Sequence, residues 1–471
     1  MIKKIFALFS ETHFLFSLVG LISGVIYVSI TPPLWGTDET SHFARVYQLA
    51  HGEILPHMNL DGYGGSIPKN LYDLNNYTQS DLMDNKGGGV ISRKDVNNAD
   101  GYKQFTDKPF SKDKHSFLWT ASYSPVAYAG SIVGVIIANF FNASIGTTIF
   151  LARLGSLFVY VALIGFAIRL LRGSRLKWLI FTAALIPVSL YQASVVTADS
   201  MAIALSMLFI SAFVRLLQYK SDEKVDNGVL WALVAAAILL PLVKINYIFL
   251  SFGVFLVPNR IFRSNKVAAI SKLASLGVAT VLGLVWTSIV RPTSSPPISQ
   301  RPDGAKTVAA DQIALILHHP LHFIEACIRS VVLNIDSYVQ SMASFIGWNY
   351  VSMPLIFTII LCFGIFFSAL YAKKELREMR GRLAILNICT LIGVISIFAA
   401  LYIAFNPTGN RVVDGIQGRY FLPLILPFIL LLASFTPIEV RIKEKLSPLI
   451  FGIISSSCLA VSVLYYLLAT Y

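Results

Sequence analysis

Residues 37–50 combine side chains that can transfer protons and bind anions. They read Thr-Asp-Glu-Thr-Ser-His-Phe-Ala-Arg-Val-Tyr-Gln-Leu-Ala, an amphipathic pattern in which Asp38 and Glu39 suit the first turn of a helix. At about 100° per residue, Asp38, His42 and Arg45 share one face. Asp38 is a candidate general base, and His42 and Arg45 are candidate substrate-binding groups. An acidic first turn with a solvated face is the structural alternative.

Two further charges interrupt apolar runs. Asp199 follows Ser-Val-Val-Thr-Ala between two apolar segments, and Lys244 lies within Leu-Pro-Leu-Val-Lys-Ile-Asn-Tyr. An ionisable side chain at membrane depth is costly unless it is paired or hydrated, so we expect both residues to bind substrate. Helix capping by Thr197 or Asp199 and a snorkelling Lys244 are the structural alternatives.

Arginines mark the later polar segments. Arg291 begins one of them, and another reads Arg-Val-Val-Asp-Gly-Ile-Gln-Gly-Arg-Tyr from Arg411 to Tyr420. A planar guanidinium suits phosphate oxygens, so Arg291, Arg411 and Arg419 are candidate substrate-binding residues, and so are the neighbouring Tyr420 and Gln417. An interfacial Arg-Tyr anchor explains the pair at the end of this segment equally well.

The histidine cluster predicts no metal site. His318 and His322 share a helical face, but His319 turns away and Pro320 disturbs the turn. The chain has neither a His-Glu-x-x-His motif nor a Cys-x-x-Cys pair. We therefore expect no cofactor, with a divalent metal ion as the open alternative.

The composition defines the class of protein that must position these residues. Of the 471 residues, 55% are hydrophobic and only 13% are charged, against about 25% charged in an ordinary soluble domain. Mean hydropathy is +0.66, and repeated apolar runs approach the ~20 residues needed to cross a bilayer. These values exclude a soluble enzyme, a secreted disulfide scaffold and a disordered chain. They predict an all-α polytopic membrane protein.

The distribution of basic residues explains most of the net charge of +13. More than half of the 38 Lys and Arg residues lie at the N-terminus or in short loops, and the positive-inside tendency assigns these to the cytoplasm. This assignment requires that segment 123–142 does not cross, but lies at the outer surface or re-enters it. The charge is a topology signal, so no nucleic-acid partner is predicted. The 11 predicted spans are about 14–30, 149–171, 178–195, 199–217, 229–243, 245–258, 273–290, 351–371, 383–404, 419–437 and 448–468.

Three parts follow from these spans. Residues 1–290 form an N-terminal transmembrane module with a large extracytoplasmic loop at 32–122 and the non-crossing helix. Residues 291–350 form a second extracytoplasmic loop, and residues 351–471 form the C-terminal transmembrane helices. Both large loops are expected to contain amphipathic helices, and the candidate site residues gather on the extracytoplasmic face.

This combination resembles the GT-C superfamily of membrane glycosyltransferases. The resemblance rests on Asp38-Glu39 after the first membrane helix, the second acidic site at Asp199, and the long first loop with its non-crossing helix. More closely, Pro-Pro followed by Asp-Glu-x-x-His-Phe-x-Arg, together with Gly-Arg-Tyr-Phe at 418–421, is similar to a poorly characterised bacterial family of polytopic membrane proteins grouped with that fold.

The resemblance implies a GT-C-like bundle in the cytoplasmic (inner) membrane of a bacterium. It implies an inverting transfer of sugar from a polyprenyl-phosphate donor to an extracytoplasmic glycan acceptor, such as O-antigen. Asp38 would be the general base, with Glu39, about 100° away on the helix, as the second candidate. Arg419, Arg291 or Lys244 would stabilise the departing lipid phosphate.

Two other function classes remain open, a lipid-linked oligosaccharide flippase or transporter and an O-antigen-type polymerase. Transporters tend to contain paired repeats with broken helices, and no convincing repeat is found here. The large outer loops therefore favour an enzyme, and Asp38 beside the first helix favours a transferase.

Overall fold

The computed structural model describes residues 11–59, 62–85, 99–117, 120–220, 223–290, 298–300, 306–347 and 350–470. Within these ranges helices dominate and the strands are short, which confirms the prediction of an all-α polytopic membrane protein. The α-helices of the N-terminal half are α2 (Thr12–Ile30), α3 (Glu39–Ala50), α4 (Lys69–Asn85), α6 (Ala99–Thr106), α7 (Ala129–Phe140), α8 (Ile145–Leu170), α9 (Lys177–Ala184), α10 (Pro187–Ala193), α11 (Ala198–Gln218) and α12 (Asn227–Val243). Those of the C-terminal half are α13 (Ile248–Ser251), α14 (Asn265–Val290), α15 (Ala309–His318), α16 (Pro320–Ala343), α17 (Leu355–Tyr371), α18 (Lys373–Arg377), α19 (Arg380–Phe405), α20 (Leu422–Phe435) and α21 (Ser447–Thr470).

Short 3₁₀ helices and strands connect these helices. The 3₁₀ helices are η1 (Pro125–Tyr128), η2 (Ile245–Tyr247), η3 (Phe252–Leu256), η4 (Asn259–Ile261), η5 (Gly418–Phe421) and η6 (Glu444–Leu446). The strands are β1 (His57–Asn59), β2 (Gly62–Pro68), β3 (Lys114–Phe117), β4 (Ile298–Gln300), β5 (Lys306–Val308), β6 (Phe345–Ile346) and β7 (Val351–Ser352).

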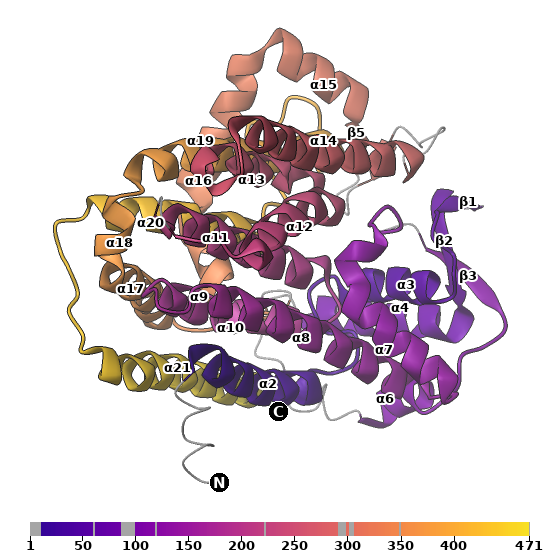
Figure 1. The fold of residues 1–471 in the computed structure, drawn as a ribbon. Helices are drawn as coiled ribbons and strands as arrows, with labels where there is room; N and C mark the ends of the chain where they lie inside the picture. Colours follow the sequence, from indigo (N-terminus) through magenta and orange to yellow (C-terminus); the bar gives the residue numbers. More distant parts are fainter. Residues whose placement is uncertain are drawn as a thin grey trace.

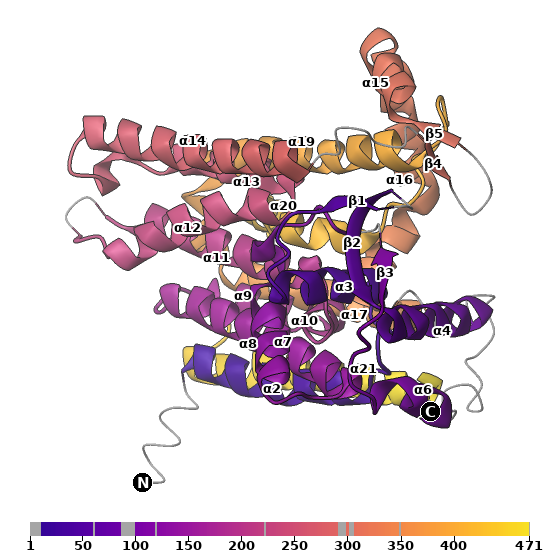
Figure 2. The ribbon, with the colours of Figure 1, turned by 90° about the vertical axis from the view of Figure 1, so that its right-hand side faces the viewer.

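The long helices stack in layers. Helices α2 and α21, from opposite ends of the chain, lie side by side at one edge of the stack, and α14 and α19 lie at the other (Figures 1 and 2). Helix α11 lies between these edges and is buried along nearly its whole length. Seven helices in the described ranges are long and apolar enough to cross a membrane: Thr12–Ile30, Ile145–Leu170, Ala198–Gln218, Asn265–Val290, Arg380–Phe405, Gly418–Phe435 and Glu444–Thr470.

Three of the predicted spans are not single helices, and one of these, 419–437, comprises η5 followed by α20. Segment 178–195 divides into α9 and α10, with Pro187 as the first residue of α10. Proline has no backbone N–H to continue the preceding helix, and every residue of α10 is buried, so packing stabilises the break. Segment 245–258 consists of η2, α13 and η3 in succession.

Helix α7 forms most of the segment predicted not to cross. Its 12 residues span about 18 Å, less than the ~30 Å hydrocarbon core of a bilayer. It packs very closely on α8: a Cβ at Gly134 would lie 2.1 Å from the carbonyl oxygen of Leu151, and one at Gly155 would lie 2.1 Å from that of Gly130. Glycine is required here because the two backbones touch.

A polar part of the chain lies at one end of the stack. It contains α3, α4, α6 and an antiparallel sheet in the order β1-β2-β3 (Figures 1 and 2). The sequence predicted only a loop beyond the first amphipathic helix, because β2 reads Gly-Tyr-Gly-Gly-Ser-Ile-Pro and such a composition is typical of loops. Gly65 of β2 pairs with Phe117 of β3, and a Cβ there would collide with Phe117 and Gln48.

Helix α16, in the second predicted loop, supports the short helix η5. The backbone N–H of Gly418 donates to the Ser341 hydroxyl at 2.8 Å, and a Cβ at Gly418 would lie 2.0 Å from the Tyr338 carbonyl oxygen. This close approach fixes the position of Arg419, the next residue.

The contact between α7 and α8 is testable by substitution. Gly134→Ala should lower the thermal unfolding midpoint of the detergent-solubilised protein, because the added methyl group must separate two helices at a cost of about 1–3 kcal/mol. Gly277→Ala is the control, since a Cβ there meets open space inside α14. Equal midpoints for the two variants would contradict the close packing.

Candidate functional site

A strained turn leads from α2 into α3 and carries Asp38. Leu34 and Asp38 have φ values of 63° and 54°, in the left-handed region that non-glycine residues seldom adopt. Asp38 is the N-cap residue of α3, but its side chain does not cap the helix. Such strain persists only where the surroundings impose it, and it is common at functional sites.

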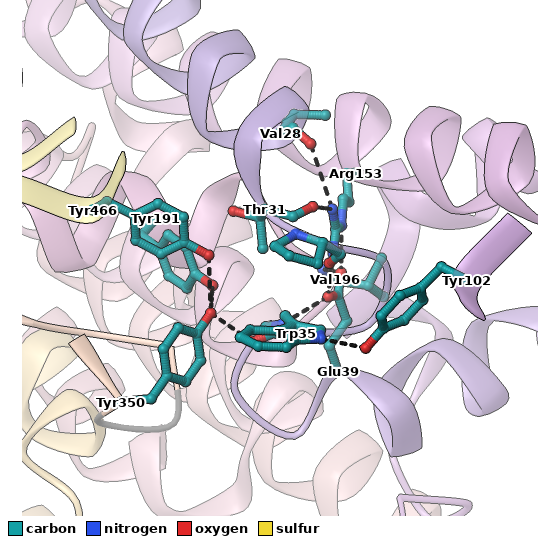
Figure 3. A network of polar contacts seen from close by, with 12 residues as sticks. Val28, Thr31, Trp35, Glu39, Tyr102, Arg153, Tyr191, Val196, Tyr350 and Tyr466 are labelled. Carbon is teal, nitrogen blue, oxygen red and sulfur yellow. Dashed lines mark hydrogen bonds and ion pairs between the residues drawn. The ribbon is translucent and has the colours of Figure 1, made fainter. Parts of the chain in front are cut away.

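The adjacent Glu39 holds this turn in place. It is fully buried, and its carboxylate accepts two hydrogen bonds from Arg153 of α8, at 2.7 and 2.6 Å (Figure 3). The same carboxylate accepts the backbone N–H groups of Gly36 at 2.8 Å and Val196 at 2.9 Å. Both oxygens are thus used within the fold, which favours a structural role for Glu39 over the catalytic role expected from the sequence.

Arg153 completes the anchor by binding the end of α2. Its guanidinium donates to the carbonyl oxygens of Thr31 at 2.7 Å and Pro32 at 2.8 Å, and more weakly to that of Val28 at 3.4 Å. The last carbonyls of a helix lack partners within it, so this contact caps α2. Arg153 therefore fixes the angle between α2 and α3 (Figure 3).

Arg45 also makes hydrogen bonds within the protein. It is fully buried and donates to the Tyr123 carbonyl at 3.1 and 3.0 Å and to the Ile54 carbonyl at 2.8 Å. A further contact joins it to Gln48. These bonds tie α3 to the segment before α7, so the contacts of Arg45 favour a structural role over substrate binding.

Four charged residues from distant parts of the chain converge beside the turn. Arg419 contacts the carboxylates of both Asp38 and Asp199, the second at 3.4 Å. Lys244 Nζ lies 2.5 Å from the other oxygen of Asp199. The four residues belong to the start of α3, the first turn of α11, the end of α12 and η5. Two cations and two anions balance one another, as a buried group of charges requires.

The side chains of the charge cluster differ in their exposure to solvent. The side chains of Asp199 and Arg419 are 3% and 5% exposed, whereas that of Asp38 is 31% exposed. Asp38 is therefore the acidic group that a substrate can reach. The Nη1 atom of Arg419 is buried and lacks a hydrogen-bond partner among the described residues. A buried guanidinium N–H without a partner is suited to an incoming anion.

Aromatic rings surround the charges. Lys244 Nζ lies 4.7 Å from the centre of the Tyr420 ring, and Arg419 Cζ lies 5.2 Å from it. The Tyr247 hydroxyl donates to the Tyr420 carbonyl at 3.2 Å. The sequence analysis did not select Tyr247, and its position three residues after Lys244 is the only signal that could have identified it.

His42 lies in the first turn of α3, where its backbone N–H donates to the Asp38 carbonyl at 3.1 Å. Its Nδ1 atom is 2.5 Å from the Tyr128 hydroxyl, and Tyr123 packs edge-on against its ring. Burial lowers the pKa of His42 from about 6.5 to about 4, although the carboxylates of Asp38 and Asp199 act in the opposite direction. His42 is therefore neutral at pH 7. The sequence analysis did not select Tyr123 or Tyr128; both come from the Tyr-Ser-Pro-Val-Ala-Tyr segment before α7.

Three other candidate residues are not members of the charge cluster, and one of them lies outside the described residues. Arg411 is exposed in the turn after α19, and Gln417 is half-buried and caps η5 through its carbonyl, which accepts the Tyr420 N–H at 3.1 Å. Arg291 lies outside the described residues. No group of three or more His, Cys, Asp or Glu side chains within the described ranges is placed to hold a metal ion.

The Glu39 anchor can be tested by removing its charge. Glu39→Gln should lower the free energy of unfolding by about 3–5 kcal/mol, because Arg153 would remain buried without its counter-ion. The control is Glu325→Gln, whose carboxylate forms an exposed i,i+4 pair with Arg329 and should change stability by less than about 1 kcal/mol. Thermal unfolding of the two purified variants is the measurement, and similar midpoints would refute the anchor.

The buried neutral His42 should make stability depend on pH. Between about pH 6.5 and pH 4 the unfolded chain binds a proton at this residue that the folded chain does not, so stability falls as the pH is lowered through this window. His42→Asn should reduce that dependence in thermal unfolding scans. His318→Asn, at an exposed histidine, is the control and should keep the wild-type slope. An unchanged slope in His42→Asn would contradict the prediction.

Comparison with known protein families supports the conclusion that the chain is a membrane protein. Residues 21–429 match the model of a family described as predicted membrane protein (DUF2142), and this range contains Asp38, Asp199, Lys244 and Arg419. No curated protein and no solved structure matches the chain. Because the family model covers most of its length, the chain belongs to the DUF2142 family of predicted membrane proteins.

Proposed function

We propose that this protein is an inverting GT-C-type glycosyltransferase that moves a sugar from a polyprenyl-phosphate donor to an extracytoplasmic glycan acceptor. The observation that carries the proposal is the convergence of Asp38 with Arg419, Asp199 and Lys244. This arrangement places a reachable carboxylate, Asp38, against the Arg419 guanidinium, while Lys244 binds the neighbouring Asp199. A reaction with an alcohol nucleophile and a phosphate leaving group requires these two components.

In the proposed step, Asp38 accepts the proton of an acceptor hydroxyl. The oxygen of that hydroxyl forms a bond to the anomeric carbon of the sugar as the bond from this carbon to the phosphate oxygen breaks. The electron pair of the broken bond leaves with the polyprenyl phosphate, which gains one negative charge. Attack opposite to the leaving group inverts the anomeric centre.

Arg419 and Lys244 are the groups that stabilise the leaving phosphate. Arg419 has the buried, unpartnered Nη1 atom, and Lys244 approaches the same Asp199 carboxylate. When a phosphate reaches Arg419, it competes with Asp38 for the guanidinium. Donor binding would thus release Asp38 to act as a base. Asp199 keeps both cations in place while this exchange occurs.

The proposed location is the cytoplasmic membrane of a bacterium, with the site on its outer face. Support comes from Asp38, which directly precedes α3. Together with α4 and β1–β3, this helix forms the polar part at one end of the helical stack (Figure 2). Nucleotide sugars are absent outside this membrane, so a lipid-linked donor suits a site there. The bilayer would deliver that donor laterally.

Asp38→Asn should abolish the transfer, because an amide cannot accept the proton. The assay uses purified protein, a panel of radiolabelled hexose and pentose polyprenyl phosphates, and surface glycan from cells lacking the gene as acceptor. General acid-base catalysis contributes about 10²–10⁴-fold, so the rate should fall at least to this extent. Asp113→Asn, at an exposed residue of the same polar part, should keep the wild-type rate.

Thermal unfolding of both variants is the control for folding: an unchanged midpoint in Asp38→Asn would show that the lower transfer rate does not result from unfolding. Near wild-type transfer by Asp38→Asn would overturn the assignment of the base. If no donor in the panel supports transfer while vesicles containing the protein move a lipid-linked oligosaccharide across the bilayer, the protein is a flippase and the proposal fails.

A further inference from the structure

A polar cavity lies on the flank of α3, outside the charge cluster. Its volume is about 510 Å³, and its walls come from α3, α4 and β3, which lie next to one another (Figure 2). Thr40 and Ser41 of α3 form one wall, Asn75 and Gln79 of α4 form another, and His115 of β3 closes it. The site described above uses none of these side chains.

The chemistry of the walls selects the kind of ligand. The ten residues that line the cavity include amides, hydroxyls and aromatic rings but no Asp, Glu, Lys or Arg. Tyr72 and His115 stack with their ring centres 3.5 Å apart and an angle of 10° between them. Amides and hydroxyls pair with the hydroxyls of a neutral ligand, and a flat aromatic pair suits its apolar face. This favours a neutral sugar over a phosphate or a charged peptide.

One buried amide is incompletely satisfied. Asn75 is 8% exposed, and its Oδ1 atom has no hydrogen-bond partner among the described residues. Its Nδ2 group donates only a long bond of 3.4 Å to the Thr40 carbonyl. A buried acceptor without a partner is destabilising, and a ligand hydroxyl in the cavity would satisfy it.

The cavity also lies on the same short helix as the proposed base. Asp38 directly precedes α3, and its backbone carbonyl accepts the Ser41 N–H at 3.1 Å. Thr40 lies further around the same flank and accepts a hydrogen bond from Gln79 at 3.2 Å. The charge cluster thus lies at the start of α3, through Asp38, and the first turn of the same helix forms a wall of the cavity.

We propose that this cavity is the acceptor subsite, which binds one or two neutral sugar units of a glycan chain whose reacting hydroxyl reaches Asp38. The identification of the ligand as the acceptor rests on the proposed function. In that function the acceptor binds at the flank of α3 and the donor binds at Arg419 and Lys244. The binding of a neutral oligosaccharide in the cavity does not itself require catalysis.

The test measures binding and transfer separately. The binding probe is a labelled neutral oligosaccharide mixture released by mild acid from the surface polysaccharide of the same cells, titrated into full-length protein in detergent. Asn76→Ala and Gln79→Ala, at an exposed and a half-buried position of the cavity, should each weaken binding about fivefold to tenfold, as expected for one lost hydrogen bond. In the transfer assay they should raise the acceptor KM by a similar factor and leave kcat nearly unchanged.

Asn227→Ala is the matched control, because it removes an exposed amide at the start of α12. Asp38→Asn should bind the oligosaccharide normally while it fails in transfer. If transfer occurs but the cavity variants keep the wild-type acceptor KM, the subsite is refuted and the proposed function stands. If the oligosaccharide binds and the cavity variants weaken it, but no donor supports transfer, the cavity binds sugar and the proposed function fails. If the wild-type protein does not bind the oligosaccharide, the subsite is refuted.

Discussion

The buried ion pair between Glu39 and Arg153 joins four parts of the chain that a membrane protein could otherwise arrange in many ways. The guanidinium caps the end of α2, and the carboxylate holds the turn before α3 and the segment before α11. A charge pair in a water-poor interior is stable only when nearly all its donors and acceptors are satisfied. That requirement makes the Glu39–Arg153 pair specific for one arrangement of the helices, because a shifted helix would leave one of the two charges unpaired.

The Glu39–Arg153 pair also explains why the adjacent residues Asp38 and Glu39 have different contacts. Asp38 is the left-handed N-cap residue and Glu39 is the first residue of α3, so Glu39 enters the core while Asp38 faces the charge cluster. The left-handed backbone of Asp38 follows from the same constraint, since both ends of the turn are fixed by Arg153 and Glu39. The strain at the candidate base is thus maintained by a structural pair one residue away.

The charge cluster depends on support from several helices at once. Arg419 reaches Asp38, 381 residues away in the chain, only because η5 rests directly on α16. Lys244 follows directly after α12, and its backbone N–H is bonded within the last turn of that helix. No single element contains two members of the cluster, so small movements between helices would alter its charge balance. Arg419 contacts two carboxylates, so an anion that displaced Asp38 would leave the guanidinium paired with Asp199.

The sequence by itself determined the class of protein and selected the charged residues that the structure brings together. Apolar runs and sparse charges indicate a helical membrane protein whatever the detailed packing, and isolated charges in such a chain are few enough to be selected individually. Asp38, Asp199, Lys244 and Arg419 were all identified in this way.

Only the tertiary structure decided how these residues are used. Arg153 lies in a long apolar helix and gave no signal that it would pair with Glu39, because that pairing spans 114 residues and depends on the packing of α8 against α2. The sheet of the polar part and the break between α9 and α10 were likewise set by burial and long-range pairing rather than by local propensity. The contacts of Glu39 and Arg45 favour structural roles for the same reason: helical spacing gives the direction of a side chain, but the neighbouring elements determine what it meets.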